Sequence, residues 1–404
     1  MARADVIVVP ASSPTPSRQT GQSNHIVWVS STVRYMVFIV SDNSDIYWSK
    51  STDGGATWTP GALIKATTCI GLAVWFDKWN PGDTGTLIHI AYMESATSDV
   101  FYQALDTADD GLDGEITVAT PAGTLAASAN TAITITKTEG GRIVIAYDGG
   151  AGGAGTFGCE KSDDYPPTGF TAIADVLDGS ATDYYHFFPG NETDTNDFYA
   201  LYWDRSAGEL TLKTYDDSGN TWGESAAIGA SLTSIASSTV APQFAGATRD
   251  TDGHLLAVWW TNADNANADL MFVDITTAAS IGTPVKILDS ADDQAGCALA
   301  IDTANDDLYV FYLGLTAGTD TAYTSMSVNY RVSADDGATW GNETTVTVRN
   351  IPCNYITASL EFASADFCIA YGGVEPAVMA LRTSYVVPSG GGGNANILHG
   401  SVVA

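Results

Sequence analysis

A short apolar segment rich in aromatic and β-branched residues recurs along the chain. The first copy reads Tyr-Met-Val-Phe-Ile-Val from Tyr35, and further copies begin at Leu87, Arg142, Phe198, Leu255, Leu308 and Phe367. Consecutive copies start 52 to 59 residues apart. Each is bounded by Gly, Asp, Asn or Ser, as expected for a strand buried on both faces. The spacing therefore predicts seven copies of one structural unit.

Each unit contains more than one strand. In the first unit, an apolar stretch from His25 precedes the repeated segment, and stretches from Asp45 and Ala62 follow it. Four antiparallel strands repeated at this spacing are typical of the blades of a β-propeller. We therefore predict an all-β chain that forms a seven-bladed β-propeller of four-stranded antiparallel blades.

The two ends of the chain are expected to meet in the last blade. That blade lacks a C-terminal fourth strand before the glycine run at Gly390–Gly393, and the apolar segment Asp5–Pro10 is otherwise unassigned. Closing the ring with this N-terminal strand would remove exposed strand edges. We predict a single propeller domain at residues 1–389 and a Gly-rich tail at residues 390–404.

Two turns after third strands share the pattern S-x-D-x-G-x-T-W. One contains Ser51, Asp53, Gly55 and Trp58, the other contains Ser333, Asp335, Gly337 and Trp340, and a third stretch keeps Asp217, Gly219 and Trp222. An Asp carboxylate can accept backbone N–H groups of such a turn, while Gly supplies a positive φ. The pattern resembles the Asp-box (BNR) repeat of sialidase-like β-propellers. This resemblance implies turn-forming residues on the outer rim, and it makes six blades, the usual sialidase number, the alternative to seven.

The charge of the chain limits its partners. It has 16 Lys and Arg against 47 Asp and Glu, a net charge of −31. This balance argues against binding to nucleic acid or to anionic membranes, because both require clustered cations. The sialidases that the turns resemble hold the substrate carboxylate with three arginines, one of them in an Arg-Ile-Pro motif, and that motif is missing. We therefore favour a protein that is not an enzyme, with a neutral or cationic ligand.

Two aromatic clusters are candidates for ligand binding, since aromatic rings beside polar groups suit sugar stacking. They are Trp75, Asp77 and Trp79 at the start of the second unit, and Tyr184, Tyr185 and His186 at the start of the fourth. The alternative for these aromatics is packing between blades. A calcium ion is a further possibility at residues 106–115, where acidic residues and glycine alternate loosely.

The sequence shows neither an apolar run long enough for a membrane span nor an N-terminal secretion signal. We expect a soluble, non-catalytic binding or structural module in a larger assembly. The setting we favour is a virion surface, where its partners would be other virion proteins and a cell-surface glycan or receptor. The alternative is a sialidase-like glycoside hydrolase acting on surface polysaccharide, with Asp77, Asp183 and Glu94 as candidate acids.

Overall fold

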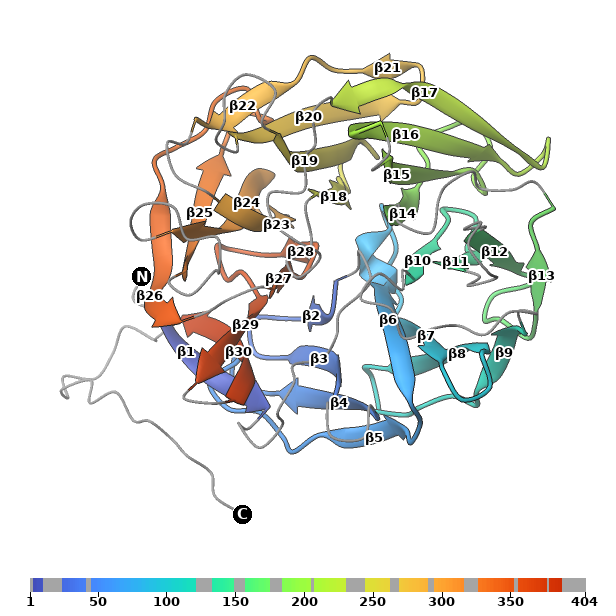
Figure 1. The fold of residues 1–404 in the computed structure, drawn as a ribbon, viewed down its shortest axis with the longest axis horizontal. Coiled ribbons are helices and arrows are strands. Elements are labelled where there is room, and N and C mark those ends of the chain that lie inside the picture. Colours follow the sequence, from blue (N-terminus) through green and yellow to red (C-terminus); the bar gives the residue numbers. More distant parts are fainter. Residues whose placement is uncertain are drawn as a thin grey trace.

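The computed structural model describes residues 3–9, 24–40, 45–120, 133–148, 157–174, 184–204, 207–229, 244–261, 269–289, 294–315, 326–351, 355–375 and 378–386. Within these ranges the chain forms thirty strands and one 3-10 helix (Figure 1). No helix in the described part is long and apolar enough to span a bilayer. The predicted tail at residues 390–404 lies outside the described residues, and the division into domain and tail stays a prediction.

The described strands pair into seven sheets arranged around a common axis, and each sheet contains one copy of the repeated segment as its second strand (Figure 1). The prediction of an all-β propeller with antiparallel, four-stranded blades is confirmed. Within each blade the strands follow chain order from the axis outward, apart from the last blade and two short additions, β21 and β28. We number the blades in chain order.

Blade 1 contains β2 (Ile26–Trp28), β3 (Arg34–Ile39), β4 (Ile46–Ser51) and β5 (Ala62–Lys65). Blade 2 contains β6 (Cys69–Phe76), β7 (Leu87–Glu94), β8 (Val100–Asp106) and β9 (Ile116–Ala119), with the 3-10 helix η1 (Asp77–Trp79) after β6. Blade 3 contains β10 (Ile133–Lys137), β11 (Ile143–Asp148), β12 (Phe157–Ser162) and β13 (Phe170–Ala172). Blade 4 contains β14 (Tyr184–Pro189), β15 (Phe198–Asp204), β16 (Glu209–Asp216) and β17 (Thr221–Gly229).

Blade 5 contains β18 (Phe244–Thr248), β19 (Leu255–Thr261), β20 (Asp269–Thr277), β21 (Ser280–Ile281) and β22 (Val285–Leu288). Blade 6 contains β23 (Gln294–Asp302), β24 (Asp307–Leu315), β25 (Met326–Ser333) and β26 (Thr344–Ile351). Blade 7 contains β27 (Tyr355–Ala358), β29 (Ile369–Glu375), β30 (Val378–Val386) and β1 (Arg3–Val9). The short strand β28 (Glu361–Phe362) belongs to the connection between β27 and β29 and pairs in parallel with β23.

The N-terminal strand closes the ring, as predicted. β1 lies antiparallel to β30, with Arg3 opposite Val386 and Ile7 opposite Arg382. It is the outermost strand of blade 7, whose other strands come from the C-terminal part of the chain. Both ends of the described chain therefore contribute to one blade, so that blade depends on pairing between residues nearly 380 positions apart.

Both faces of the inner strands are buried, which explains their continuous apolar sequences. All seven residues of β19, Leu255–Thr261, are buried, and so are all eight residues of β6. Each blade packs its two faces against its neighbours, and the largest cluster of buried apolar side chains includes Val27 of blade 1 and Tyr312 of blade 6. The core is thus shared around the ring.

Several of the scarce cations connect neighbouring blades. Lys50 of blade 1 lies 2.9 Å from Asp110 of blade 2, and Lys161 of blade 3 lies 2.5 Å from Asp217 of blade 4. Further pairs of this kind are Arg34 with Asp366, Lys65 with Glu115, and Arg249 with Asp336. These ion pairs hold blade junctions together, so the charges of these cations are compensated inside the ring.

The connections of an antiparallel blade alternate between the two faces of the ring. The link from the first to the second strand lies on the same face as the link from the third to the fourth. We call this the turn face, because both S-x-D-x-G-x-T-W turns connect third to fourth strands, β4 to β5 and β25 to β26. The segment after β6 that begins with η1, and the connection from β12 to β13, lie on the same face by the same rule.

Candidate functional site

The carboxylate of Asp77 is the centre of a buried polar network on the turn face. Its Oδ1 accepts hydrogen bonds from Lys137 Nζ at 2.6 Å and from the Tyr165 hydroxyl at 2.7 Å, and lies 2.9 Å from His89 Nε2. Its Oδ2 accepts the backbone N–H of Leu87 at 2.9 Å. Four donors therefore surround a carboxylate whose side chain is 1% exposed.

Three blade elements position these donors. Asp77 begins η1 directly after the inner strand β6, and His89 of β7 lies opposite Trp75 in the strand register. Lys137 ends β10, the inner strand of blade 3, while Tyr165 comes from the connection between β12 and β13. We call the set Asp77, Asp83, His89, Tyr102, Lys137 and Tyr165 the Asp77 network. It ties blade 2 to blade 3.

The network fixes the positions of its protons. Burial alone would raise the pKa of Asp77, but the hydrogen bonds of His89, Lys137 and the Leu87 N–H, with the charge of His89, hold it well below its usual range. Burial and the Asp77 carboxylate raise the pKa of the Tyr165 hydroxyl far above its ordinary value. Asp77 is thus an ion at neutral pH and Tyr165 keeps its proton. A carboxylate in this state cannot act as a general acid.

Lys137 is neutralised within the network. Its Nζ binds Asp77 and also Asp83 Oδ2 at 2.6 Å, and its side chain is 6% exposed, whereas that of Asp83 is 24% exposed. The second nitrogen of His89, Nδ1, lies 2.7 Å from the Tyr102 hydroxyl. With two carboxylates on one ammonium, the network offers no spare positive charge to an anionic substrate.

Tyr165 is the member of the network that reaches the surface. The residue is 38% exposed, and Leu63 is the other large apolar side chain that is exposed among the described residues. Lys137 Nζ lies 3.8 Å from the centre of the Tyr165 ring, and the His89 ring packs edge-on at 5.9 Å. The hydroxyl is tied to Asp77, so ring and hydroxyl are both held in place before any ligand arrives.

The predicted binding aromatics of blade 2 are buried. Trp75 and Trp79 are each 1% exposed and pack edge to face at 5.7 Å. Trp75 Nε1 also donates to Asn80 at 2.6 Å. The connection after β6 lies on the turn face, together with the S-x-D-x-G-x-T-W turns. Asp77, between the two tryptophans in sequence, is directed into the network described above.

The second predicted cluster begins β14, at the opposite face of the ring. Tyr185 is buried and stacks on Tyr202 at 4.7 Å, while His186 is buried and burial lowers its pKa to about 3. Tyr184 is partly exposed and stacks on Trp203 at 5.6 Å. These rings fill space between strands, and ligand contact through this cluster stays a prediction.

The other two candidate acids are less informative. Glu94, at the end of β7, accepts a hydrogen bond from the Thr97 hydroxyl at 2.8 Å and one from Thr67. Asp183 lies outside the described residues. The contacts of Glu94 are thus with Thr67 and Thr97, and a role for Asp183 stays a prediction.

The two S-x-D-x-G-x-T-W turns have the same hydrogen bonds. In the first, Asp53 Oδ1 accepts the Thr57 N–H at 2.8 Å and the Ser51 hydroxyl at 2.9 Å. In the second, Asp335 Oδ1 accepts from Thr339 and Ser333 at the same two distances. Trp58 and Trp340 each donate Nε1 to the turn glycine's carbonyl, that of Gly55 or Gly337, at 3.2 and 3.1 Å. These residues build turns, as predicted.

The third stretch behaves differently, and the prediction that Asp217 clamps its own turn is wrong. The Gly219 N–H donates to Asp216 Oδ1 at 2.8 Å, whereas Asp217 Oδ1 binds Lys161 of the neighbouring blade. β16 continues to Asp216, so the turn is tighter and the preceding carboxylate is the one that faces its N–H groups. Trp222 packs on Tyr215 at 5.3 Å.

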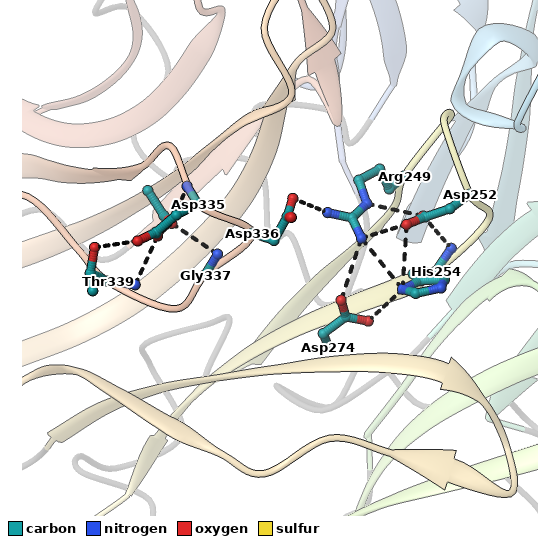
Figure 2. Close-up of polar contacts among 9 residues, drawn as sticks. Arg249, Asp252, His254, Asp274, Asp335, Asp336, Gly337 and Thr339 are labelled. Atoms are coloured by element: carbon teal, nitrogen blue, oxygen red, sulfur yellow. Dashed lines mark hydrogen bonds and ion pairs between the residues drawn. The ribbon is translucent and has the colours of Figure 1, made fainter.

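Figure 2 shows how the second turn joins blade 5. Asp336, the residue after the turn aspartate, points to Arg249, with 2.6 Å between Oδ1 and NH1. Arg249 also binds Asp252 at 2.5 Å and lies 3.4 Å from Asp274, which itself contacts His254 Nδ1 at 2.8 Å. The arginine is thus surrounded by carboxylates and links two blades.

Several carboxylates of the predicted calcium segment, residues 106–115, have partners within the protein. Asp110 binds Lys50 Nζ, and Glu115 binds Lys65 Nζ at 2.6 Å. Asp109 Oδ1 accepts the N–H of Gly111 at 2.8 Å. Across the part of the chain that the structure describes, no three His, Cys, Asp or Glu side chains are grouped as metal ligands. Calcium binding here stays a prediction.

Comparison with known proteins adds the fold. No family model and no curated protein matches the chain. Among solved structures, an ulvan lyase of a polysaccharide lyase family has a TM-score of 0.57 at 10% identity, covering 94% of this chain and 95% of its own. A mutant Trypanosoma rangeli sialidase has a TM-score of 0.50 at 10% identity, covering 95% of this chain and 59% of its own. An Aleuria aurantia lectin, described as a six-bladed propeller with a fucose recognition mode, has a TM-score of 0.45 at 14% identity, covering 81% of this chain and 97% of its own. The likeness to the lyase and the sialidase shows that this chain has a sialidase-like β-propeller fold.

Proposed function

We propose that this protein is a non-catalytic glycan-binding propeller and that Tyr165 is the surface on which a sugar ring stacks. The observation that carries the proposal is the partly exposed Tyr165 ring, which is fixed by the Asp77 carboxylate at its hydroxyl and by Lys137 at its face. Aromatic rings that need no reordering bind sugars at low entropic cost. Fold likeness to a polysaccharide lyase and a sialidase is consistent with a glycan ligand, although fold by itself does not give function.

The charge around Tyr165 selects against acidic sugars. Lys137 and His89 at most balance the charges of Asp77 and Asp83, and the chain as a whole carries −31. A uronate, sialate or sulfate at this position would meet net negative potential. We therefore propose a neutral or amine-bearing glycan as ligand.

The absence of catalysis is part of the proposal. The Asp77 carboxylate already has four polar partners, three at Oδ1 and one at Oδ2, and its proton is lost at neutral pH. The arginines whose side chains the structure describes bind carboxylates or carbonyls of the protein itself: Arg34, Arg142, Arg249 and Arg331. These contacts support the view that the chain lacks the arginine clamp of the sialidases.

We further propose the biological setting inferred from the resemblance of the turns to Asp boxes, a virion surface where the propeller contacts cell-surface glycan. Labelled protein should then bind intact host cells, and glycosidase treatment of those cells should abolish the binding. Binding that survives removal of the glycans would contradict this setting.

One observation favours the alternative of a glycoside hydrolase. The Tyr165 hydroxyl lies 2.7 Å from a buried carboxylate, and a tyrosine paired with a carboxylate is also the nucleophile of the sialidases. The raised pKa of Tyr165 opposes nucleophilic attack. Release of reducing sugar from a polysaccharide panel, lost in Tyr165→Phe, would establish the enzyme.

The binding experiment compares two variants with a control. Tyr165→Ala removes the ring and should weaken glycan binding about tenfold, equivalent to about 1.4 kcal/mol. Tyr165→Phe retains the ring but loses its hydroxyl bond to Asp77, so its affinity should lie between those of Tyr165→Ala and the parent. Leu63→Ala removes an exposed apolar side chain elsewhere, in β5, and should bind as the parent does. Equal affinity of Tyr165→Ala and the parent would refute the proposal.

A further inference from the structure

The segment Asp77–Thr86 reaches across the ring. Its Gly82 N–H donates to Asp250, which belongs to the connection between β18 and β19 in blade 5. The two residues are 168 positions apart in the sequence. Gly82 belongs to blade 2 and Asp250 to blade 5, and blades 3 and 4 lie between them along the ring. Figure 1 shows the start of this segment, beyond the inner end of β6, close to the ring axis.

A third blade contributes a carboxyl group at the same place. Glu361 of β28 lies in the turn-face connection of blade 7, and its charge interacts with those of Asp250 and Lys78. Glu361 Oε1 is buried and has no hydrogen-bond partner among the described residues. Buried polar atoms are nearly always paired, so an unpaired carboxyl oxygen requires an explanation.

The charged groups around Glu361 come from every element packed against it. Asp250 faces it from blade 5 and Lys78 from η1. On β23, the strand that pairs with β28, Asp302 accepts the N–H groups of Ser364 and Ala365 at 2.8 and 2.6 Å. Beyond that turn, Asp366 is neutralised by Arg34 at 2.5 Å. A negative charge on Glu361 would therefore act mainly on Asp250, which it repels, and on Lys78, which it attracts.

We propose that the segment Asp77–Thr86 is a latch over the ring axis, fastened to Asp250 while Glu361 is neutral and released when Glu361 ionises. A charge on Glu361 repels Asp250 and attracts Lys78, which lies on the latch itself. The repulsion pushes the Asp250 carboxylate away from Glu361, and the attraction draws the segment toward blade 7, so together they break the bond between Gly82 and Asp250. The latch would regulate the binding site proposed above, because the same segment supplies Asp77 and Asp83 to Tyr165 and Lys137.

The switching range is at mildly alkaline pH. Burial raises the pKa of the Glu361 carboxyl to about 8, the Asp250 charge raises it further, and Lys78 lowers it. Glu361 is thus mostly neutral at pH 6.5 and mostly ionised at pH 9.5. Only the positioning of the segment changes, since no covalent chemistry is involved.

Hydrogen exchange followed by mass spectrometry tests the latch without any glycan. In the parent, the peptide covering residues 77–86, corrected for intrinsic exchange, should lose about tenfold or more protection between pH 6.5 and pH 9.5. The peptide covering residues 51–58 is the internal reference, because its Thr57 N–H also donates to a carboxylate and lies in a different blade. In Glu361→Gln the loss of protection should disappear.

A second variant keeps the test decisive if Glu361→Gln folds poorly. Asp250→Asn retains an oxygen that can accept the Gly82 N–H but removes the charge that opposes ionised Glu361, so protection should persist to higher pH. Unchanged protection in the parent across this range, or an equal loss in Glu361→Gln, would overturn the latch. Because no ligand is present, either result leaves the proposed glycan binding to be judged by its own experiment.

Discussion

Replacing Glu361 with glutamine should stabilise the protein at neutral and alkaline pH. The pKa of this carboxyl is raised from 4.5 to about 8, first by burial and then by Asp250. The folded state therefore keeps a proton that the unfolded chain releases above about pH 4.5. Stability is fully present below that pH, falls as the pH rises, and levels off above about 8.

The size of the effect follows from the shift. A difference of about 3.5 pH units, at about 1.36 kcal/mol for each, sets an upper limit of about 5 kcal/mol. Local rearrangement on ionisation, such as release of the latch, lowers this value, so we expect a loss of about 2–5 kcal/mol between pH 4.5 and pH 8.5. Glutamine retains the shape and polarity of the side chain but cannot ionise.

The assay is urea unfolding followed by tryptophan fluorescence at pH 5 and pH 8.5. The difference in free energy of unfolding between Glu361→Gln and the parent should be small at pH 5 and at least about 2 kcal/mol in favour of the variant at pH 8.5. Glu224→Gln is the matched control, because Glu224 is largely exposed and its 3.3 Å distance to Lys213 is long for an ion pair. A difference for Glu361→Gln that does not change with pH would refute the reasoning.

Three further predictions concern the ring. Asp77→Asn should destabilise the protein by about 3 kcal/mol, because it removes a buried charge that Lys137 and Tyr165 contact. Thermal unfolding should therefore show a lower Tm, and an unchanged Tm would contradict the central place of Asp77 in the network. Asp53→Ala should cost about 1 kcal/mol through loss of the turn bonds to Thr57, whereas Asp53→Asn should cost less; equal losses for both, measured in urea, would argue against the hydrogen-bond role. Removal of residues 1–9 should leave β30 as an open edge and lead to aggregation seen by light scattering, and a monomeric, fully stable product would contradict ring closure by β1.

Most of the fold could be predicted from the strand pattern, because each strand is encoded by a short, continuous stretch of sequence. The run Leu255–Trp260 is apolar at every position, and only a strand covered on both faces explains why these residues and Thr261 are all buried. The unpaired segment Asp5–Pro10 and the incomplete last blade were enough to predict the pairing of β1 with β30. The S-x-D-x-G-x-T-W turns were predictable for the same reason, since their hydrogen bonds lie within eight residues.

The site was harder to predict because its members come from distant positions. Asp77 was a candidate, but Tyr165 lies 88 residues away in a connection that shows no motif. Lys137 ends an inner strand between Thr136 and Thr138, and a lysine at that position was the one available signal. Aromatic content was a poor guide to exposed rings, because Trp75, Trp79 and Tyr185 are buried in packing contacts. The exposed ring is a tyrosine that follows two aspartates and precedes two prolines.

The most direct test of glycan binding at Tyr165 is a calorimetric titration of the protein with a neutral oligosaccharide and with its amine-bearing and carboxylate-bearing analogues. The parent should bind the neutral and amine-bearing forms, and Tyr165→Ala should bind them about tenfold more weakly. The affinity of Tyr165→Phe should lie between the two, because this variant keeps the ring and loses its bond to Asp77. Preferential binding of the carboxylate-bearing form, or the same affinity in Tyr165→Ala as in the parent, would contradict the proposed site.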